Sequence, residues 1–574
     1  MRLLLVITSI CYGLIIAPVS AEKKSAIPTE QPAAIIPQIY QLVDDRVLDI
    51  PLFIRALKHP DRKVRVSALT GLARIGGEPV VALVAPFLTH AEPETRQLAA
   101  FALGLSGAAK SSSYLWKRVA VEQNLSVKHE LYLALANLGG DGLITAMLQR
   151  LNREPAKVTQ ASIFQAMGIA LTFHRELKLD YDSIDFDTLI SHFSRGDDLA
   201  VRAGFFLDRI PNIANSLKAS QLLSLSKRPL SPLASIYLSR LIGKVSGQDK
   251  THNRALLAWL IAQSESDNLN LQIEAVRAMK NMFDFPQALI QLGKMQASSQ
   301  PLLAQTALKV IADSSENSAD ILALLKAQLK NKNDALVVEA ISGLSQRQNK
   351  ADMNWVVKLF AHPSAYVKIK LIQILKNKSI KNGTPTEFDM VIRFLTNDPV
   401  KAVGQYAKRV LENNTVSVET VATSPEFSEV SRLAGTQLQI NTSAGAFTIE
   451  LLGDAPYTGW HFFNNARLGV YDGSYFSRVI GNFIAQGGDT IGDGSGSSER
   501  TIREEINLLV HQPLSVAMAT AGKDTGTSQF FINTTRNFHL DRHYTVFARV
   551  VIGKNNVYQL SNGVRILSVV PLEK

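Results

Sequence analysis

The sequence has almost no cysteine: Cys11 is the only one in a chain of 574 residues. Cys11 lies inside an N-terminal segment that we expect to be removed, so the mature chain would contain none. This excludes disulfide bonds and a thiol nucleophile from the mature protein. A chain of this length can bury enough surface to fold without disulfide bonds.

The N-terminus also lacks a run of apolar residues long enough to cross a membrane. Arg2 precedes a short apolar run that ends near Ala17, and the small residues Val19-Ser20-Ala21 follow as a cleavage motif. This pattern predicts a signal peptide over residues 1–21, export from the cytoplasm and, for a cysteine-free chain, the bacterial periplasm. An uncleaved anchor and a lipid attached to Cys11 stay open as alternatives.

Acidic residues are few relative to basic ones, which gives a net charge of +11. From Gly435 onward, eleven Lys and Arg balance eleven Asp and Glu, so the whole excess lies earlier in the chain. Weak contact with an anionic surface is one interpretation of this excess. Solvated Lys and Arg on outer helix faces are the simpler one. Basic residues do not alternate with aromatic ones, so we expect no nucleic-acid binding.

A helical pattern recurs in the first two thirds of the chain. Three clear copies end at Gly76, Gly107 and Gly139, which are 31 and 32 residues apart. Each copy places small or apolar residues at helical spacing, and its glycine can adopt the left-handed conformation that ends a helix. Such units cannot bury their faces alone and stack into a curved rod. Over residues 45–412, after an N-terminal extension at 22–44, the pattern resembles HEAT-like repeats.

The resemblance to HEAT-like repeats implies a concave surface that binds protein partners. No His, Asp or Glu cluster in these repeats has the spacing of metal ligands, and we expect neither a metal nor a cofactor in the protein. Short HEAT-like units also occur in bilin lyases, but no residue here marks a pigment site. A non-repeating helical domain is the alternative fold.

The pattern changes to period two after a polar segment at 413–435, which we interpret as a linker. In the last part of the chain, 436–574, Leu438, Ile440 and Thr442 alternate with polar residues, and strand-like runs such as SVAMA and YTVFARVV follow. These features predict a compact, mostly β domain.

Two segments in this domain, FSRVIGNFIAQGGD at 476–489 and AGKDTGTSQFFIN at 521–533, resemble the two hallmark segments of cyclophilins. The order of the surrounding elements fits as well. The resemblance implies an eight-stranded antiparallel barrel with two capping helices. It also implies peptidyl-prolyl cis–trans isomerase (rotamase) activity in protein folding, with proline-containing polypeptides as clients.

The resemblance assigns roles residue by residue. Arg478 matches the catalytic arginine, and Gln486 a second residue of the catalytic set. The remaining matches are to substrate-binding positions: Phe483, Ile484, Ala519, Thr520, Ala521, Gln529, Phe531, His539, Leu540 and Tyr544. Among these, Phe483, Ile484, Phe531 and Leu540 would form the proline pocket.

Several positions depart from the family pattern. His539 replaces a frequent Trp on the pocket rim, Tyr544 replaces a frequent His, and Ile484 replaces a frequent Met. Gly481-Asn482 replaces a Pro-Gly turn, so we expect this turn to be more flexible than in relatives. These departures put sequence preference in doubt more than activity.

Two functional hypotheses follow. The first is an exported isomerase whose solenoid recruits clients or partners. The second is a non-catalytic scaffold whose β domain only recognises proline-containing segments. The presence of Arg478 with a full set of pocket residues favours the first.

Overall fold

The computed structural model describes residues 31–181, 184–193, 197–347, 354–382, 387–412, 424–498 and 500–572. The predicted signal peptide lies outside the described residues. Within these ranges, none of the helices combines the length and the apolar character needed to cross a membrane.

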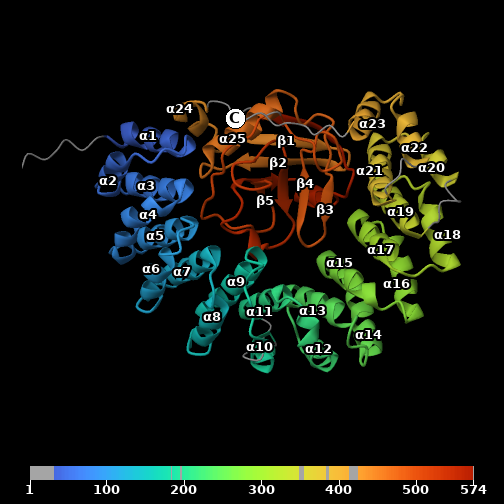
Figure 1. The fold of residues 1–574 in the computed structure, drawn as a ribbon, viewed down its shortest axis with the longest axis horizontal. Helices are drawn as coiled ribbons and strands as arrows, with labels where there is room; N and C mark the ends of the chain where they lie inside the picture. The colour runs from blue at the N-terminus through green and yellow to red at the C-terminus, as the bar shows by residue number, and fades with distance from the viewer. Residues whose placement is uncertain are drawn as a thin grey trace, which may run out of the picture.

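The described residues between 32 and 412 form helix pairs that stack side by side into a curved solenoid (Figure 1). The helices are α1 (Pro32–Asp44), α2 (Ile50–Leu57), α3 (Arg62–Ile75), α4 (Glu78–Val84), α5 (Pro93–Leu105), α6 (Ser111–Val119), α7 (Leu125–Leu138), α8 (Leu143–Leu151), α9 (Lys157–Phe173), α10 (Phe186–Phe193), α11 (Asp198–Arg209), α12 (Ala219–Ser226), α13 (Pro232–Val245), α14 (Asn253–Ser264), α15 (Leu269–Ala278), α16 (Pro286–Gln296), α17 (Pro301–Asp313), α18 (Ala319–Gln328), α19 (Asp334–Arg347), α20 (Asn354–Leu359), α21 (Ala365–Asn382), α22 (Glu387–Leu395) and α23 (Lys401–Glu412). Odd-numbered helices from α3 to α21 pack on one another along the concave side, and even-numbered helices lie outside them. Helix α1, from the segment expected to be an extension, packs against α3 as the first helix of the arc.

The repeat pattern has a local physical basis. Asp61 and Asn124 cap the first turns of α3 and α7 by accepting hydrogen bonds from backbone N–H groups. Gly76 and Gly139 end the same helices with positive φ angles of 69° and 65°. Gly104 lets α5 approach α7 closely, because a Cβ there would lie 2.6 Å from the Ala134 Cα. The caps and small residues thus set both helix length and helix spacing.

The C-terminal domain is one antiparallel sheet of eight strands in the order β3-β4-β6-β5-β7-β2-β1-β8. The strands are β1 (Gln437–Thr442), β2 (Gly445–Leu451), β3 (Arg478–Ile480), β4 (Ile484–Gly487), β5 (Ser515–Met518), β6 (Phe530–Asn533), β7 (Val546–Ile552) and β8 (Ile566–Pro571). Helix α25 (Pro456–Arg467) packs on β7 and β8, and the short α26 (Lys554–Val557) packs on β2. The prediction of helical repeats followed by an eight-stranded antiparallel domain is confirmed.

The sheet is curled, and its two edges meet. A bridge pairs Tyr475, just before β3, with Arg565, just before β8. Inside the curl, Phe462 of α25 packs against Phe530 of β6 and Phe547 of β7, with ring centroids 5.2 and 5.3 Å apart. This aromatic core fixes the sheet on which the candidate site is built.

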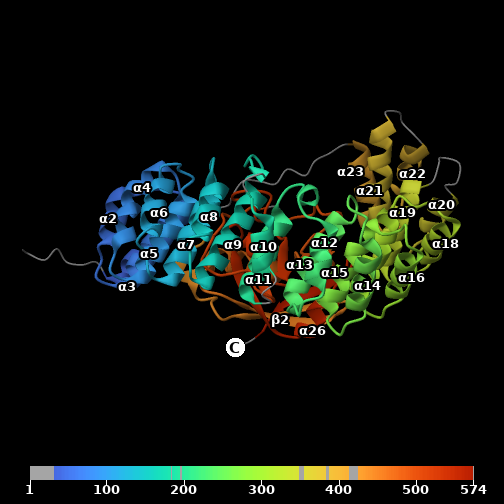
Figure 2. The ribbon, with the colours of Figure 1, turned by 90° about the horizontal axis from the view of Figure 1, so that it is seen from below.

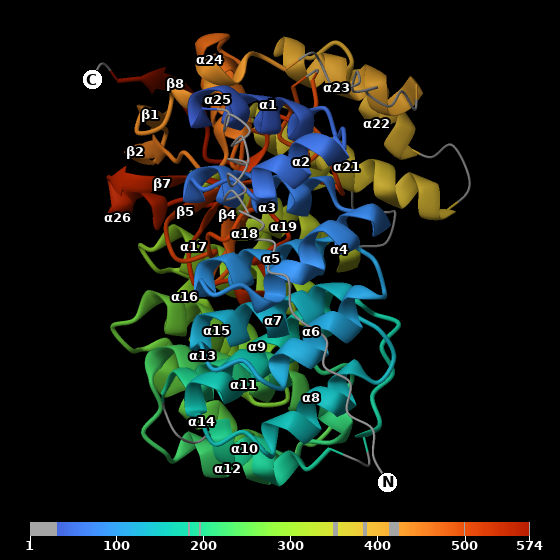
Figure 3. The same cartoon turned by 90° about the vertical axis from the view of Figure 1, so that its left-hand side faces the viewer.

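The concave side of the solenoid holds the C-terminal domain (Figure 1). Strands β1, β2 and β8 and helix α26 project past one face of the arc in the turned views (Figures 2 and 3). Contacts with the domain run along the arc: Arg74 of α3 pairs with Glu505 at 3.4 Å, Glu130 of α7 with Arg542 at 2.8 Å. The surface on which we expected protein partners is therefore covered by the chain's own β domain.

Helix α24 (Phe427–Ser431) lies at the N-terminal end of the arc (Figure 1). It follows α23 in sequence but packs against α1, where Phe427 stacks on Tyr40 with ring centroids 4.3 Å apart. Ser424 donates a hydrogen bond to Asp44 at the end of α1. Part of the predicted linker, residues 413–423, lies outside the described residues. The rest of it returns the chain to the start of the solenoid.

Candidate active site

A short hairpin, β3–β4, places Arg478 opposite Gln486. The Arg478 guanidinium donates to the Gln486 side-chain oxygen at 3.4 Å. The Gln486 amide in turn donates to the Gln529 side-chain oxygen at 2.8 Å, and the Gln529 amide donates to the Gly494 and Gly496 carbonyls. The chain of hydrogen bonds holds both amides beside the cation.

An apolar cluster separate from the main core lies next to this cation. Its buried members are Ile484 of β4, Phe531 of β6 and Leu540 of the short 3-10 helix Phe538–Leu540, together with Ala517 and Val546. Phe483, Ala519 and Tyr544 pack on it from its partly exposed side. The Phe531 and Tyr544 rings meet edge to face at 5.5 Å. Six of the predicted residues thus lie in one small apolar cluster, which we call the pocket after the role that the resemblance predicts for it.

Arg478 stands at the edge of this pocket with its side chain exposed. Its guanidinium carbon lies 5.5 Å from the centroid of the Phe483 ring. Burial of the group lowers its pKa and Tyr544 opposes the shift, but an arginine remains protonated at any physiological pH. Arg478 can therefore donate hydrogen bonds to a polar atom held in the pocket without losing its charge.

Ala519, Thr520 and Ala521 follow β5, and Ala519 packs on the apolar cluster. The Ala519 N–H donates to the Gln529 carbonyl at 3.0 Å, and the Ala521 N–H donates to the Thr525 hydroxyl at 2.8 Å. Thr520 is half-buried and Ala521 is exposed.

His539 lies at the other end, against the solenoid. Its ring stacks on Phe483 at 5.3 Å and faces Phe205 of α11 at 6.3 Å. Burial lowers the pKa of His539 well below its usual value, and Arg209 and Arg240 lower it further. The imidazole is therefore neutral and accepts a contact from Arg209 at 3.5 Å. The predicted rim residue is in contact with the helical repeats as well as with the pocket.

The turn between β3 and β4, residues 481–483, was expected to be flexible, but the solenoid holds it. Arg277 donates to the Gly481 carbonyl at 3.1 Å and Arg240 to the Asn482 carbonyl at 3.2 Å. The Asn482 amide donates to Glu274 at 3.1 Å. A Cβ on Gly481 would lie 2.5 Å from Ile273 of α15, so glycine permits this close contact. The residues that hold the Gly481-Asn482 turn, in place of the rigidity of a Pro-Gly turn, therefore belong to α13 and α15.

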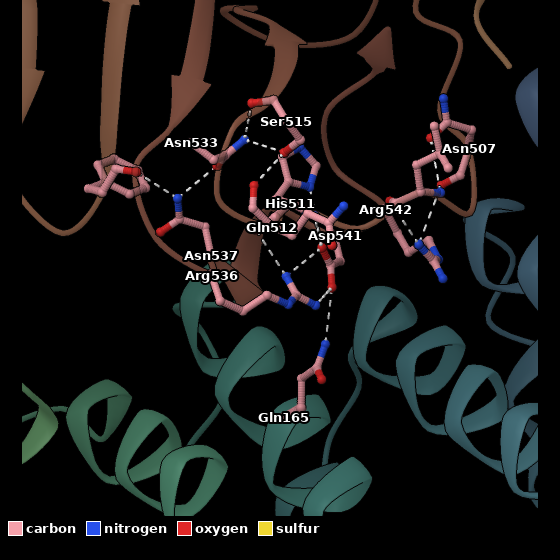
Figure 4. Close-up of polar contacts among 12 residues, drawn as sticks. Gln165, Asn507, His511, Gln512, Ser515, Asn533, Arg536, Asn537, Asp541 and Arg542 are labelled. Carbon is pink, nitrogen blue, oxygen red and sulfur yellow. Dashed lines mark hydrogen bonds and ion pairs between the residues drawn. The ribbon is translucent and has the colours of Figure 1, made fainter. Parts of the chain in front are cut away.

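A polar network under the pocket was not predicted from the sequence (Figure 4). The buried Asp541 carboxylate accepts hydrogen bonds from the Arg536 guanidinium, from the His511 backbone N–H at 2.9 Å and from the Gln165 side-chain amide of α9 at 3.2 Å. Asn537 donates to the Phe483 carbonyl at 2.8 Å. The network holds Asn537 and Asp541, which lie before and after Leu540 in the sequence. One of its hydrogen-bond donors, Gln165, belongs to the solenoid.

Two partly buried histidines, His129 and His543, predict that the protein loses stability in acid. Burial, the largest cause, lowers the pKa of His543 to about 3 and that of His129 to about 3. An unfolded histidine titrates near 6.5, so below about pH 6.5 the unfolded chain binds more protons than the folded chain. The stabilisation is complete above that pH and falls toward pH 3, by up to about 1.4 kcal/mol per pH unit for each histidine.

We expect His543→Phe, which can keep the stacking on Phe173 at 3.5 Å, to reduce the pH dependence by about one proton. Urea unfolding at several pH values between 7.5 and 5 measures the slope for both proteins. Other titrating groups contribute equally to both, so equal slopes would contradict this role of His543.

Comparison with known proteins agrees with the geometry. Residues 437–573 match the model of the family described as cyclophilin type peptidyl-prolyl cis-trans isomerase/CLD, and residues 50–136 match HEAT repeats. A peptidyl-prolyl cis-trans isomerase of Synechococcus elongatus is 39% identical over 137 residues, which are 23% of this chain and 94% of that protein. One from Helicobacter pylori is 44% identical over 114 residues, 19% of this chain and 70% of that protein.

A longer relative, peptidyl-prolyl cis-trans isomerase 9 of Schizosaccharomyces pombe, is 38% identical over 137 residues. The match spans 23% of this chain and only 22% of that protein. All three similarities therefore concern a region the size of the C-terminal domain. Through that domain, the chain belongs to the cyclophilin-type peptidyl-prolyl cis–trans isomerases.

Proposed function

We propose that this protein accelerates cis–trans isomerisation of X–Pro bonds in client polypeptides. The observation that carries the proposal is the position of the Arg478 guanidinium at the edge of an apolar pocket, beside the ordered amides of Gln486 and Gln529. Uncatalysed rotation has a barrier of about 18–20 kcal/mol because resonance keeps the amide planar. No covalent step is needed to lower it.

The site can stabilise the twisted amide selectively. Phe483, Ile484, Phe531 and Leu540 hold the proline ring by apolar contact. When the amide twists, the prolyl nitrogen regains a lone pair, which accepts a hydrogen bond from Arg478. A planar amide offers no such acceptor, so the contact favours the transition state over the ground state.

The test is an exchange measurement by NMR on a short X–Pro peptide with the full-length protein. We expect cis–trans exchange to accelerate in proportion to protein concentration. Binding of the peptide without acceleration would support the non-catalytic scaffold instead, and neither binding nor acceleration would refute both.

We also propose that the protein works after export, in the periplasm of a bacterium. The N-terminal sequence and the absence of cysteine after residue 21 support this. Sequencing the N-terminus of the mature protein from fractionated cells should find Glu22 first. Because the β domain covers the concave side, a partner protein recruited by the solenoid would bind its outer helices.

The solenoid should affect turnover through the β3–β4 turn. Arg277→Met removes the hydrogen bond to the Gly481 carbonyl, and Phe483 follows two residues later. A lost hydrogen bond of this kind is worth about 1 kcal/mol, so we expect kcat/KM to fall about three- to tenfold. Steady-state exchange rates measure this.

Arg254→Met on the outer helix α14 is the matched control and should keep the wild-type rate. Circular dichroism shows whether the helices are intact. An Arg277→Met protein that retains full kcat/KM would show that the solenoid does not position the turn for catalysis.

A further inference from the structure

A cavity of about 340 Å³ lies between the solenoid and the end of the apolar pocket. Helices α11, α13 and α15 form one wall, and the β3–β4 turn with residues 535–539 forms the other. Phe483 and His539 line the cavity, and the same two rings stack at the border of the pocket.

The walls of the cavity are strongly basic. Six cationic side chains line it: Arg209, Arg240, Lys244, Arg277, Lys280 and Arg536. Two carboxylates, Asp208 and Glu274, line it as well. The arrangement gives a formal excess of positive charge in a partly open cavity between two domains.

Both carboxylates already form ion pairs with cationic side chains of the cavity wall. Asp208 pairs with Lys244 at 2.8 Å and Arg240 at 3.7 Å. Glu274 pairs with Arg277 at 2.8 Å and Arg240 at 3.3 Å. Burial alone would raise the pKa of each carboxyl, but the neighbouring cations outweigh it and hold both below the usual value.

Arg209 and Lys280 remain without an acidic partner. Arg209 approaches the neutral His539 at 3.5 Å and lies over the Phe205 ring at 5.3 Å, while its buried Nε has no hydrogen-bond acceptor. Lys280 is exposed, and it lines both this cavity and a second one that Arg478 also lines. Throughout the described part of the chain, no carboxylate forms an ion pair with either side chain.

We propose that this cavity is a binding subsite for a carboxylate side chain of the client, an Asp or Glu near the isomerised proline. The proposal rests on the isomerase function given above. Charge-assisted hydrogen bonds from Arg209 would satisfy its unused donors, and partial exclusion of water strengthens them. The solenoid would thereby add sequence preference to a pocket that by itself recognises only the proline ring.

The experiment uses the full-length protein and peptides that differ only by Glu or Gln at one position, scanned over the four residues on each side of the proline. NMR exchange gives kcat/KM, and calorimetry gives Kd for each peptide. We expect Glu to be preferred about tenfold at one position or two neighbouring positions. Added salt should reduce the preference, because part of the cavity is open to solvent.

The double variant Arg209→Gln/Lys280→Gln should bring the Glu/Gln ratio close to one. The double variant Lys63→Gln/Lys117→Gln changes net charge equally on exposed sites of α3 and α6 and should keep the wild-type ratio. Equal values for Glu and Gln at every position, or an unchanged ratio in the first variant, would overturn the subsite. Peptide binding without turnover refutes only the isomerase function, because the ratio of Kd values still tests the subsite.

Discussion

Replacing Arg478 by alanine should lower kcat/KM for an X–Pro peptide at least about tenfold, which corresponds to at least about 1.4 kcal/mol of transition-state stabilisation. The side chain is exposed, and the one hydrogen bond that it forms to another described residue, Gln486, is long at 3.4 Å. The fold should therefore be intact, and the Kd for the peptide should change less than the rate. NMR exchange measures the rate, and calorimetry measures the binding.

Arg549→Ala is the matched control, since Arg549 is an exposed arginine on β7 that pairs only with Glu450 among the ion pairs of the described residues. It should turn over at the wild-type rate. An Arg478→Ala protein as fast as this control would remove Arg478 from the mechanism and leave the pocket as a recognition site.

The second large effect concerns the buried ion pair between the two domains. Arg542 of the β domain donates to both oxygens of Glu130 on α7, at 3.1 and 2.8 Å, and both side chains are almost completely buried. Glu130→Ala leaves the Arg542 cation without its partner in a dry interface. We expect the free energy of unfolding to fall by about 3–5 kcal/mol, as measured by urea denaturation.

Removing both charges tests the cause. A double variant, Glu130→Leu/Arg542→Met, should recover most of the loss, because no unpaired charge stays buried. The exposed pair between Arg62 and Glu94 gives the comparison, and Glu94→Ala should cost less than about 1 kcal/mol. A Glu130→Ala protein as stable as Glu94→Ala would show that water reaches the interface.

The sequence was sufficient for the fold class of the two parts of the chain, and several of the site residues it predicts lie together in the structure, because both predictions depend on local signals. A glycine that follows a run of apolar residues at helical spacing, such as Gly76 or Gly139, ends a helix through its own backbone conformation. The segment around Arg478 contains enough specific residues to indicate which other residues lie near it in the fold. The structure places Ile484, Phe531 and Leu540 in one cluster. Their roles in binding stay a prediction until the variants are measured.

The interface could not be predicted from the sequence in the same way. Glu130, Gln165 and Glu274 are ordinary polar residues of amphipathic helices, and nothing near them in sequence indicates that their partners lie hundreds of residues later. For the same reason the Gly481-Asn482 turn was expected to be flexible. The sequence does not show that Arg240 and Arg277 bind this turn, and the absence of a proline by itself suggests only greater backbone freedom.

The position of the β domain inside the arc also sets an order of folding. The chain is synthesised from the N-terminus, so Glu130 forms part of a stacked solenoid long before Arg542, 412 positions later, exists. Until then, charged residues of the concave face such as Glu130 have no partner, and the space inside the arc is not yet filled by the β domain. We therefore expect a long-lived intermediate in which the solenoid is folded and the β domain is not yet docked inside it. Docking should be slow, because the contacts that complete it join residues far apart in the sequence.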